Sequence, residues 1–468
     1  MTQTAAGQAV SVPKPAFGPV FAVVVAGVAM SNLDMFIVNV ALPDIGTQFS
    51  GSSLASLSWI LNAYAVVFAA LLVPAGSLAD RTSPRNAYLL GIAVFTVASA
   101  LCAVAPGVWL LVAARVIQAI GAAMLIPSSL GLLLAAAPPE KRIPAVRGWT
   151  AISGLAAALG PVIGGLLTQL DWRWVFLVNL PIGVFALLLG ARVLPRIAAR
   201  PAAARLDLAG AVLLTLGIAV LALGLVKSED WGWTSLKVIL SLAAAVVLLA
   251  AFFASSARHP SPVLPLGLLR IPGVGPATFA NLLFAVSFGA MLLSAVLWCQ
   301  NVWHWSPLKT GLAIAPGPVL VPAFAMGVGP VIKRFGAAAV SAVGSVLFGA
   351  GIGWWVYRLD TAHEYAAGLL PGMLLTGVGV GMVVPTLVGA AVSALPPQSF
   401  STGSAVVTMA RQVGSVLGVA LLVAFIGAPA GADAAVTAFD HGWDFVLVAT
   451  ALAAVACLFI PRPKKPAA

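Results

Sequence analysis

The chain has 468 residues, of which 61% are hydrophobic and only 8% are charged. Soluble proteins carry about 25% charged residues, so this composition excludes an ordinary soluble protein. The net charge of +11 does not indicate nucleic-acid binding, because most basic residues fall on one side of the predicted membrane spans. Apolar runs long enough to cross a bilayer recur along the whole chain, which predicts an all-α membrane protein.

We predict fourteen membrane-spanning helices from these apolar runs. Gly and Pro are frequent inside them, which membrane helices tolerate because neighbouring groups satisfy the freed backbone. In chain order the predicted spans are 17–42, 54–78, 86–106, 108–136, 148–170, 174–194, 207–226, 236–256, 274–300, 308–332, 336–356, 364–392, 402–428 and 442–460.

The first span contains a carboxylate, Asp34, in the run Ser31-Asn-Leu-Asp-Met-Phe-Ile-Val-Asn-Val-Ala-Leu42. It is the only acidic residue well inside a predicted span and lies roughly 12 Å from Leu42 by the helical rise per residue. An Asp at the bilayer centre costs about 2.5–3.5 kcal/mol on insertion scales, so such residues are usually functional. We therefore predict that Asp34 carries a proton. The alternative is a structural carboxyl group that is hydrogen-bonded across helices.

The 24 Lys and Arg residues set the predicted orientation. If the N-terminus lies in the cytoplasm, most of them fall in inner loops and tails, as the positive-inside rule requires. Five fall in outer loops and two within spans: Arg173, Lys227, Lys237, Lys309 and Arg358, and then Arg115 and Arg411. We expect both tails, 1–16 and 461–468, to be cytoplasmic, and we expect residues 1–16 not to be a cleaved signal.

An internal repeat predicts the architecture. The run Gly121-Ala-Ala-Met-Leu-Ile-Pro-Ser-Ser-Leu-Gly131 matches Gly379-Val-Gly-Met-Val-Val-Pro-Thr-Leu-Val-Gly389, and Gly160 matches Gly418 at the same offset. We infer two six-helix halves, 17–194 and 274–460, joined by a linker, 195–273, with two extra helices. Parallel halves of this kind hold a substrate site between them and rock to give alternating access.

Several motifs together resemble the major facilitator superfamily, and within it the fourteen-helix drug:proton antiporters of multidrug and antibiotic efflux. They are Leu33-Asp34 with Asn39-Val-Ala-Leu-Pro43, Gly76-Ser-Leu-Ala-Asp80-Arg81-Thr-Ser-Pro-Arg85, Arg115-Val-Ile-Gln118-Ala-Ile-Gly121, Ala156-x-x-x-Gly160-Pro161-x-x-Gly164-Gly165 and Trp172-Arg-Trp-Val-Phe-Leu-Val-Asn179-Leu-Pro181-Ile-Gly183. The resemblance covers nearly the whole chain. It departs from the family pattern at Ser83, Pro84, Ala119 and Ala156.

The resemblance implies that Arg115 takes part in proton coupling, and Asp34 is the only acid within the spans available to it; the alternative is an Arg that extends to the interface. It also implies a conformational latch of Gly76, Asp80, Arg81 and Arg85 with the repeat-related Lys333 and Arg334. Asp80 has two possible partners, a basic residue or the N-terminus of a neighbouring helix. The alternative to a latch is a charged loop that is simply solvated.

The Gly160-Pro161-x-x-Gly164-Gly165 motif allows close helix approach, and a bend at Pro161 favours an interface between the halves. We expect the substrate cavity to be lined by neutral polar groups and one cation: Asn39, Asn62, Tyr64, Gln118, Asn281, Arg411 and Gln412. For Arg411 four roles remain open: hydrogen bonds to carbonyls, an inner cavity, contact with an anionic substrate, or packing. Because no second acid lies at mid-span, we expect neutral or monocationic substrates rather than dications.

No Cys or His spacing indicates a metal site, a disulfide or a catalytic group, so we expect no enzyme activity and no cofactor beyond the proton motive force. The function that these observations predict is proton-coupled export of small amphipathic compounds, by a monomer in the inner membrane of a prokaryote. The alternatives are a facilitator, importer or lipid translocator of the same fold, or a membrane enzyme or sensor.

Overall fold

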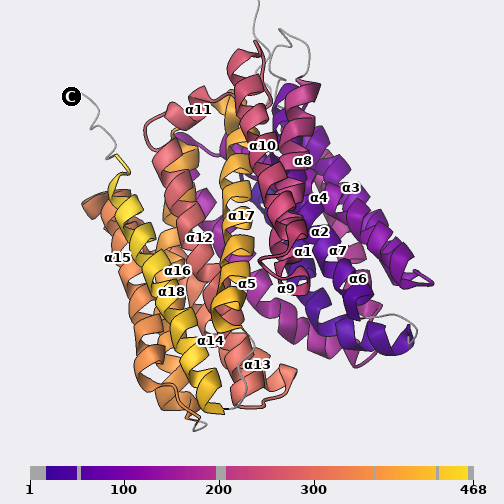
Figure 1. Cartoon of the computed structure of the whole chain (residues 1–468). Helices are drawn as coiled ribbons and strands as arrows, with labels where there is room; N and C mark the ends of the chain where they lie inside the picture. Colours follow the sequence, from indigo (N-terminus) through magenta and orange to yellow (C-terminus); the bar gives the residue numbers. More distant parts are fainter. Residues whose placement is uncertain (1–16, 50–53, 197–206, 362–363, 428–431, 462–468) are drawn as a thin grey trace, which may run out of the picture.

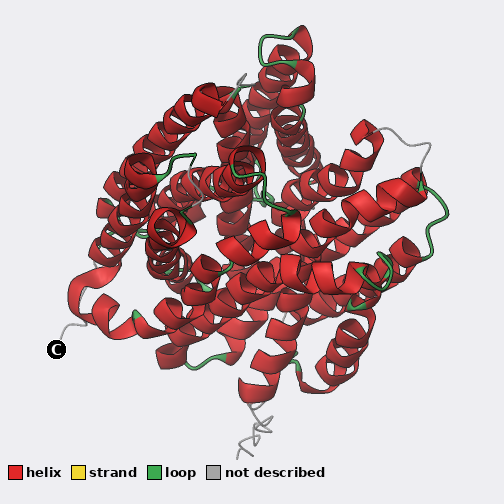
Figure 2. Cartoon of the chain, turned by 90° about the horizontal axis from the view of Figure 1, so that it is seen from below, coloured by secondary structure: helices red, strands yellow, loops and turns green. Residues whose placement is uncertain are grey.

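The computed structural model describes residues 17–49, 54–196, 207–361, 364–427 and 432–461, and over this part of the chain it consists of helices and loops without a strand (Figures 1 and 2). Of the tails that we predict to be cytoplasmic, all of 1–16 and all but the first residue of 461–468 lie outside the described residues, as does linker segment 197–206.

The described residues up to Val193 form five long helices and a shorter pair. Ser83 begins α3 by accepting a hydrogen bond from the Asn86 amide, and Pro84 occupies the first turn, where its missing N–H is harmless. The elements are α1 (Phe17–Gln48), α2 (Leu54–Arg81), α3 (Pro84–Ala103), α4 (Val108–Ala136), α5 (Pro139–Thr168), α6 (Trp174–Leu177) and α7 (Asn179–Val193).

The middle of the chain forms a pair of apolar helices with short helices beside it, and the last part repeats the pattern of long helices. The middle elements are α8 (Leu208–Val226), α9 (Ser228–Trp231), α10 (Leu236–Arg258) and α11 (Gly267–Arg270). The last are α12 (Val274–Leu297), η1 (Trp298–Val302), α13 (Pro307–Ile314), α14 (Pro316–Gly327), α15 (Gly329–Arg358), η2 (Tyr365–Leu369), α16 (Leu370–Ser393), η3 (Pro397–Ser399), α17 (Phe400–Ile426) and α18 (Ala432–Leu458).

Within the described residues, 13 helices are long and apolar enough to cross a membrane, or 14 if the bent helix α5 is one span. The predicted number therefore agrees, but several predicted boundaries were wrong. Helix α5 begins at Pro139 rather than near residue 148, and α18 begins at Ala432 rather than near 442. Both extensions carry polar residues, which mark a helix's exit from the apolar layer but do not end the helix. Helix α15 extends from Gly329 to Arg358, but its helical geometry breaks at Gly336 (φ 87°), which is where the predicted span 336–356 begins.

The two sets of helices pack in the same order. In the first, α3 packs on α4, α2 on α4, α1 on α5, and α7 on α1 and α3; in the second, α15 packs on α16, α14 on α16, α12 on α17, and α18 on α12 and α15. Glycines matched by the sequence repeat make equivalent contacts. A Cβ on Gly121 would lie 2.7 Å from the Phe95 nitrogen, and one on Gly379 would lie 2.9 Å from the Phe348 nitrogen.

The two sets meet along two seams, where α2 packs on α17 and α5 packs on α14. Figure 1 shows the indigo and purple helices of the first set on one side and the orange and yellow helices of the second on the other. Helix α8 packs on α10 and also on both α2 and α17. The pair α8 and α10 therefore lies beside the first seam rather than apart from the bundle.

Candidate functional site

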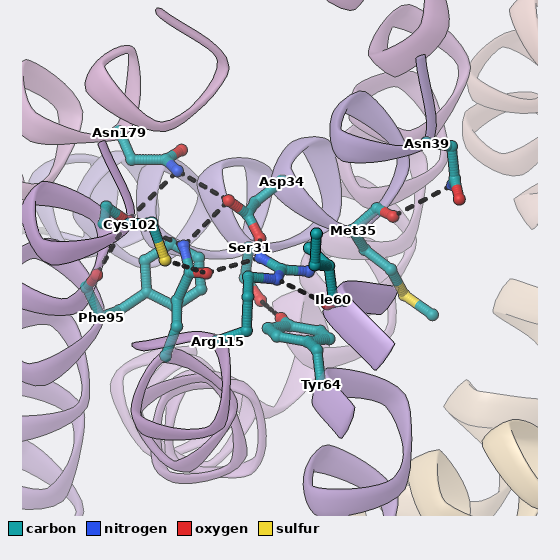
Figure 3. Close-up of polar contacts among 12 residues, drawn as sticks. Ser31, Asp34, Met35, Asn39, Ile60, Tyr64, Phe95, Cys102, Arg115 and Asn179 are labelled. Carbon is teal, nitrogen blue, oxygen red and sulfur yellow. Dashed lines mark hydrogen bonds and ion pairs between the residues drawn. The ribbon is translucent and has the colours of Figure 1, made fainter. Parts of the chain in front are cut away.

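Asp34 lies on α1 at the centre of a hydrogen-bonded cluster and is fully buried (Figure 3). Arg115 Nη1 of α4 donates to Asp34 Oδ2 at 2.5 Å. Two amide groups donate to Asp34 Oδ1, each at 2.9 Å: Gln118 Nε2 of α4 and Asn179 Nδ2 of α7. Every one of these contacts is with a donor, so the arrangement suits the ionised carboxylate.

A second row of contacts holds these donors in place. Ser99 Oγ of α3 accepts hydrogen bonds from Gln118 Nε2 (2.8 Å) and Asn179 Nδ2 (3.3 Å), and donates to the Phe95 carbonyl. Arg115 Nη1 also donates to Gln118 Oε1. Because each amide bridges the carboxylate and Ser99, the cluster ties α1, α3, α4 and α7 together.

Small residues allow the four helices to come close enough for this cluster. Gly91 of α3 faces the Gly121 carbonyl of α4, where a Cβ would lie at 2.8 Å, and Gly183 of α7 leaves no room for a side chain beside Thr96. Gly121 lies six residues after Arg115 on α4, and Gly183 four residues after Asn179 on α7. The glycines therefore set the helix separation at which these polar side chains reach α1 and α3.

Arg115 also contacts α2, on the far side from Asp34. Its Nε donates to the Ile60 carbonyl at 3.2 Å, and its guanidinium carbon lies 4.2 Å from the centre of the Tyr64 ring. The ring face attracts the cation, which adds to the ion pair in this buried site. Arg115 is 1% exposed. The alternative that it extends to the interface is therefore wrong.

A small pocket lies beside this cluster, between α1, α2, α4 and α5 of the first set and α17 of the second. The space between its walls, including the part that is open to solvent, is about 320 Å³. Its walls are aromatic and apolar with a few polar groups and one cation. They comprise Ser31, Asn32, Met35, Tyr64, Phe68, Ile126, Trp149, Arg411 and Gln412.

Tyr64 and Ser31 separate the pocket from the ion pair. Both line the pocket, and their hydroxyl oxygens lie 3.5 Å apart. The Tyr64 ring stacks on Arg115 and Arg115 binds Asp34, so one aromatic ring joins the pocket to the buried carboxylate.

Three of the predicted cavity residues line this pocket, namely Tyr64, Arg411 and Gln412, and four do not. Gln118 belongs to the Asp34 cluster. Asn39 is exposed and donates to the Met35 carbonyl of its own helix (Figure 3). It follows Met35 by four residues, which places it on the same face of α1 as that wall residue but about one turn beyond the pocket. Asn62 lies two residues before Tyr64, about 200° away on α2, and Asn281 is buried against α17, donating to the Val407 carbonyl.

Sequence reasoning missed several site residues. Asn179 and Ser99 hold the Asp34 cluster, and Ser31, Asn32 and Trp149 line the pocket. Asn179 had a signal, since it is a lone amide in an apolar helix and lies within one of the recognised motifs. Trp149 donates to Ser129 and gave no signal that separates it from an interfacial tryptophan.

Asp80, at one end of the α2–α17 seam, caps the N-terminus of α17. Its carboxylate accepts hydrogen bonds from the Ser401 amide (3.0 Å), the Thr402 amide (2.7 Å) and the Thr402 hydroxyl (2.7 Å). These amides belong to the first turn of α17, where N–H groups lack intrahelical partners and the helix dipole favours an anion. Of the two predicted partners, the structure shows the helix N-terminus.

The other predicted latch residues do not form one cluster. Gly76 faces α17, where a Cβ would lie 2.7 Å from the Ala405 Cβ. Arg81 donates to the Ser261 and Pro262 carbonyls of the loop after α10, and Arg85 donates to the Ala191 carbonyl at the end of α7. Lys333 and Arg334 are exposed. At this end of the second seam Arg147 of α5 packs against Gly329 of α15 instead.

The glycine motif of α5 packs within the first set and not between the sets, so that prediction was wrong. Cβ atoms on Gly160 and Gly164 would lie 2.6 Å from the Phe36 Cβ and 3.0 Å from the Ile37 carbonyl of α1. The helix does bend there, by 41° between Ala157 and Val162. Another part of α5 meets α14, where a Cβ on Gly154 would lie 3.3 Å from Val321 Cγ1.

A membrane bundle of two repeated helix sets, with an ion pair sealed beside a pocket between them, defines a transporter of small molecules. The chain belongs to the Major Facilitator Superfamily, whose family model matches residues 24–419. It is therefore a multi-span membrane protein of a transporter family rather than of an enzyme family.

The chain is similar to two antibiotic exporters. It is 35% identical over 407 residues to the tetracenomycin C resistance and export protein of Streptomyces glaucescens, covering 86% of this chain and 75% of that protein. It is 34% identical over 429 residues to the cephamycin export protein CmcT of Amycolatopsis lactamdurans, covering 91% and 88%. The human organic anion transporter MFSD10 shares the fold, with a TM-score of 0.68 at 16% identity, over 93% of this chain and all of that one.

Proposed function

We propose that the protein is a proton-coupled exporter of small amphipathic compounds, working as a monomer by alternating access in the inner membrane of a bacterium. The similarity to antibiotic exporters supports export, and the motif resemblance to drug:proton antiporters supports proton coupling. The observation that carries the proposal is the buried Asp34–Arg115 pair one residue layer from a pocket between the two helix sets. The orientation with both termini in the cytoplasm comes from the distribution of basic residues.

Protonation of Asp34 would change every contact in the cluster. A neutral carboxyl group no longer compensates the Arg115 guanidinium, which keeps its contacts with α2 at Ile60 and Tyr64. Asp80 also lies on α2, twenty residues after Ile60 and therefore about 30 Å from it by the helical rise per residue. A shift of α2 driven by the ion pair is thus transmitted to the contact that closes the α2–α17 seam.

Asp34→Asn tests the coupling. In everted vesicles with an imposed proton gradient, we expect the variant to lose uphill transport, because Asn cannot release a proton. It should keep downhill exchange of substrate, because the pocket walls are unchanged. The matched control is Asp44→Asn, which alters an exposed acid on the same helix. Uphill transport at the wild-type rate in Asp34→Asn would show a facilitator or a different proton site.

A further inference from the structure

We propose that the pocket binds amphipathic aromatic monoanions, with the Arg411 guanidinium as the counter-ion. This inference rests on the export function proposed above, because it takes the pocket to be the substrate site. It specifies the substrate class and replaces the expectation of neutral or monocationic compounds.

The first observation is that Arg411 lacks a partner. Over the described parts of the chain it forms no ion pair and no hydrogen bond, although it lies on the transmembrane helix α17 and lines the pocket. The other arginine within a span, Arg115, has a carboxylate, an amide, a carbonyl and an aromatic ring. A guanidinium at this depth is costly unless something compensates its charge, and a ligand that enters the pocket is in a position to do so.

The second observation is the absence of negative charge from the pocket. None of its described lining residues is acidic. The nearest carboxylate in the cluster next to it, Asp34, is fully buried behind Tyr64 and accepts hydrogen bonds from three side chains. A cationic ligand would therefore meet Arg411 without a free carboxylate to offset the repulsion.

The remaining walls select the shape of the ligand. Phe68 and Tyr64 stack with ring centres 5.9 Å apart, and Trp149 adds a third aromatic surface. Ser31, Asn32 and Gln412 provide neutral hydrogen-bonding groups around them. A flat aromatic compound with one carboxylate or phenolate group fits this pocket. The aromatic walls would cover its ring system, and Arg411 would bind its anionic group.

This substrate class also fixes how coupling must work. An anion does not compete with a proton for the same carboxylate, so binding and proton exchange have to be linked through the helices. The link available is Tyr64, which lines the pocket and stacks on Arg115. It follows that Asp34→Asn should still bind the anion while it loses uphill transport.

The test uses three ligands with one ring system and different charges: 9-anthracenecarboxylate, 9-anthracenecarboxamide and 9-anthracenemethylammonium. Their binding to the purified full-length protein in detergent is followed by anthracene fluorescence. We expect the carboxylate to bind about tenfold tighter than the amide, as a charge-assisted hydrogen bond provides, and the cation to bind most weakly. Arg411→Gln should abolish the ranking, and Arg411→Lys should keep it. The control Gln412→Leu, which alters the neighbouring wall residue, should affect all three ligands alike.

If Arg411→Gln does not fold, Gln412→Glu tests the same point by placing a carboxylate beside Arg411, and it should remove the preference for the anion. Tightest binding of the cation by the wild type, or a ranking that survives both Arg411→Gln and Gln412→Glu, overturns the inference but leaves proton-coupled export standing. Conversely, unchanged uphill transport in Asp34→Asn overturns the proposed function and leaves the charge ranking intact.

Discussion

Asp80 of α2 caps α17 across the α2–α17 seam, and Asp80→Asn weakens that contact. The carboxylate accepts three hydrogen bonds, of 3.0, 2.7 and 2.7 Å. Asn keeps a single acceptor oxygen and turns an N–H₂ group towards the donors of α17. A hydrogen bond to a charged group contributes about 1.5–3 kcal/mol, so we expect a loss of roughly 2–3 kcal/mol from the closed state. That corresponds to a shift of about 30-fold to 150-fold in the equilibrium between closed and open seams.

Spin labels at Asn86 and Lys333 report this shift, because both are exposed and lie near the Asp80 end on different helix sets. Double electron–electron resonance should show a longer distance population growing in Asp80→Asn. The three native cysteines are buried and can be replaced beforehand. Asp207→Asn is the matched control: Asp207 caps α8 by accepting from the Gly210 amide at 2.7 Å, within the linker. An unchanged distance distribution in Asp80→Asn, or an equal change in Asp207→Asn, would refute the reasoning.

Three further changes test the site. Asn179→Ala removes one donor from the buried carboxylate and should slow proton-driven transport roughly tenfold while downhill exchange stays near wild type; a change in both would indicate a packing defect. Tyr64→Phe keeps the ring on Arg115 and should retain coupling, whereas Tyr64→Leu should let protons and substrate move independently, measured as the ratio of proton to substrate flux. Gly121→Leu should abolish stable folding in a thermal-shift assay because it forces α3 and α4 apart, whereas Gly107→Ala, whose added Cβ would meet nothing within 4 Å, should be tolerated.

The ion pair could be predicted from the sequence because charged residues are rare within the apolar spans. Asp34 was identifiable as the sole mid-span acid, and Arg115 then had no other partner. The neutral groups around them were not identifiable in the same way. Asn179 and Ser99 occur among many polar residues in membrane helices, and only the rotation of each helix decides which of them face Asp34.

The cavity illustrates the same difficulty. Nearly every helix in this bundle is apolar on all sides, so periodicity does not distinguish the face towards lipid from the face towards the pocket. Asn62 was expected to face the cavity and lies on another side of α2 from the wall residue Tyr64, whereas Asn39 shares the face of Met35 and lies one turn beyond the pocket. The repeat was more informative, because its matched glycines mark close helix contacts that depend on the backbone and not on which way a long side chain points.

The position of α8 makes the two seams of the bundle unequal. Leu214 and Ile218 of α8 pack into one apolar cluster with Val73 of α2 and Ala405 of α17, and Arg81 fastens the end of α2 to the loop after α10. At the α5–α14 seam, the described helices that contact both α5 and α14 are α13 and α16, which belong to the second set. Across the first seam, by contrast, an inserted helix contacts both sets, so any separation of α2 from α17 must also disrupt the packing of α8.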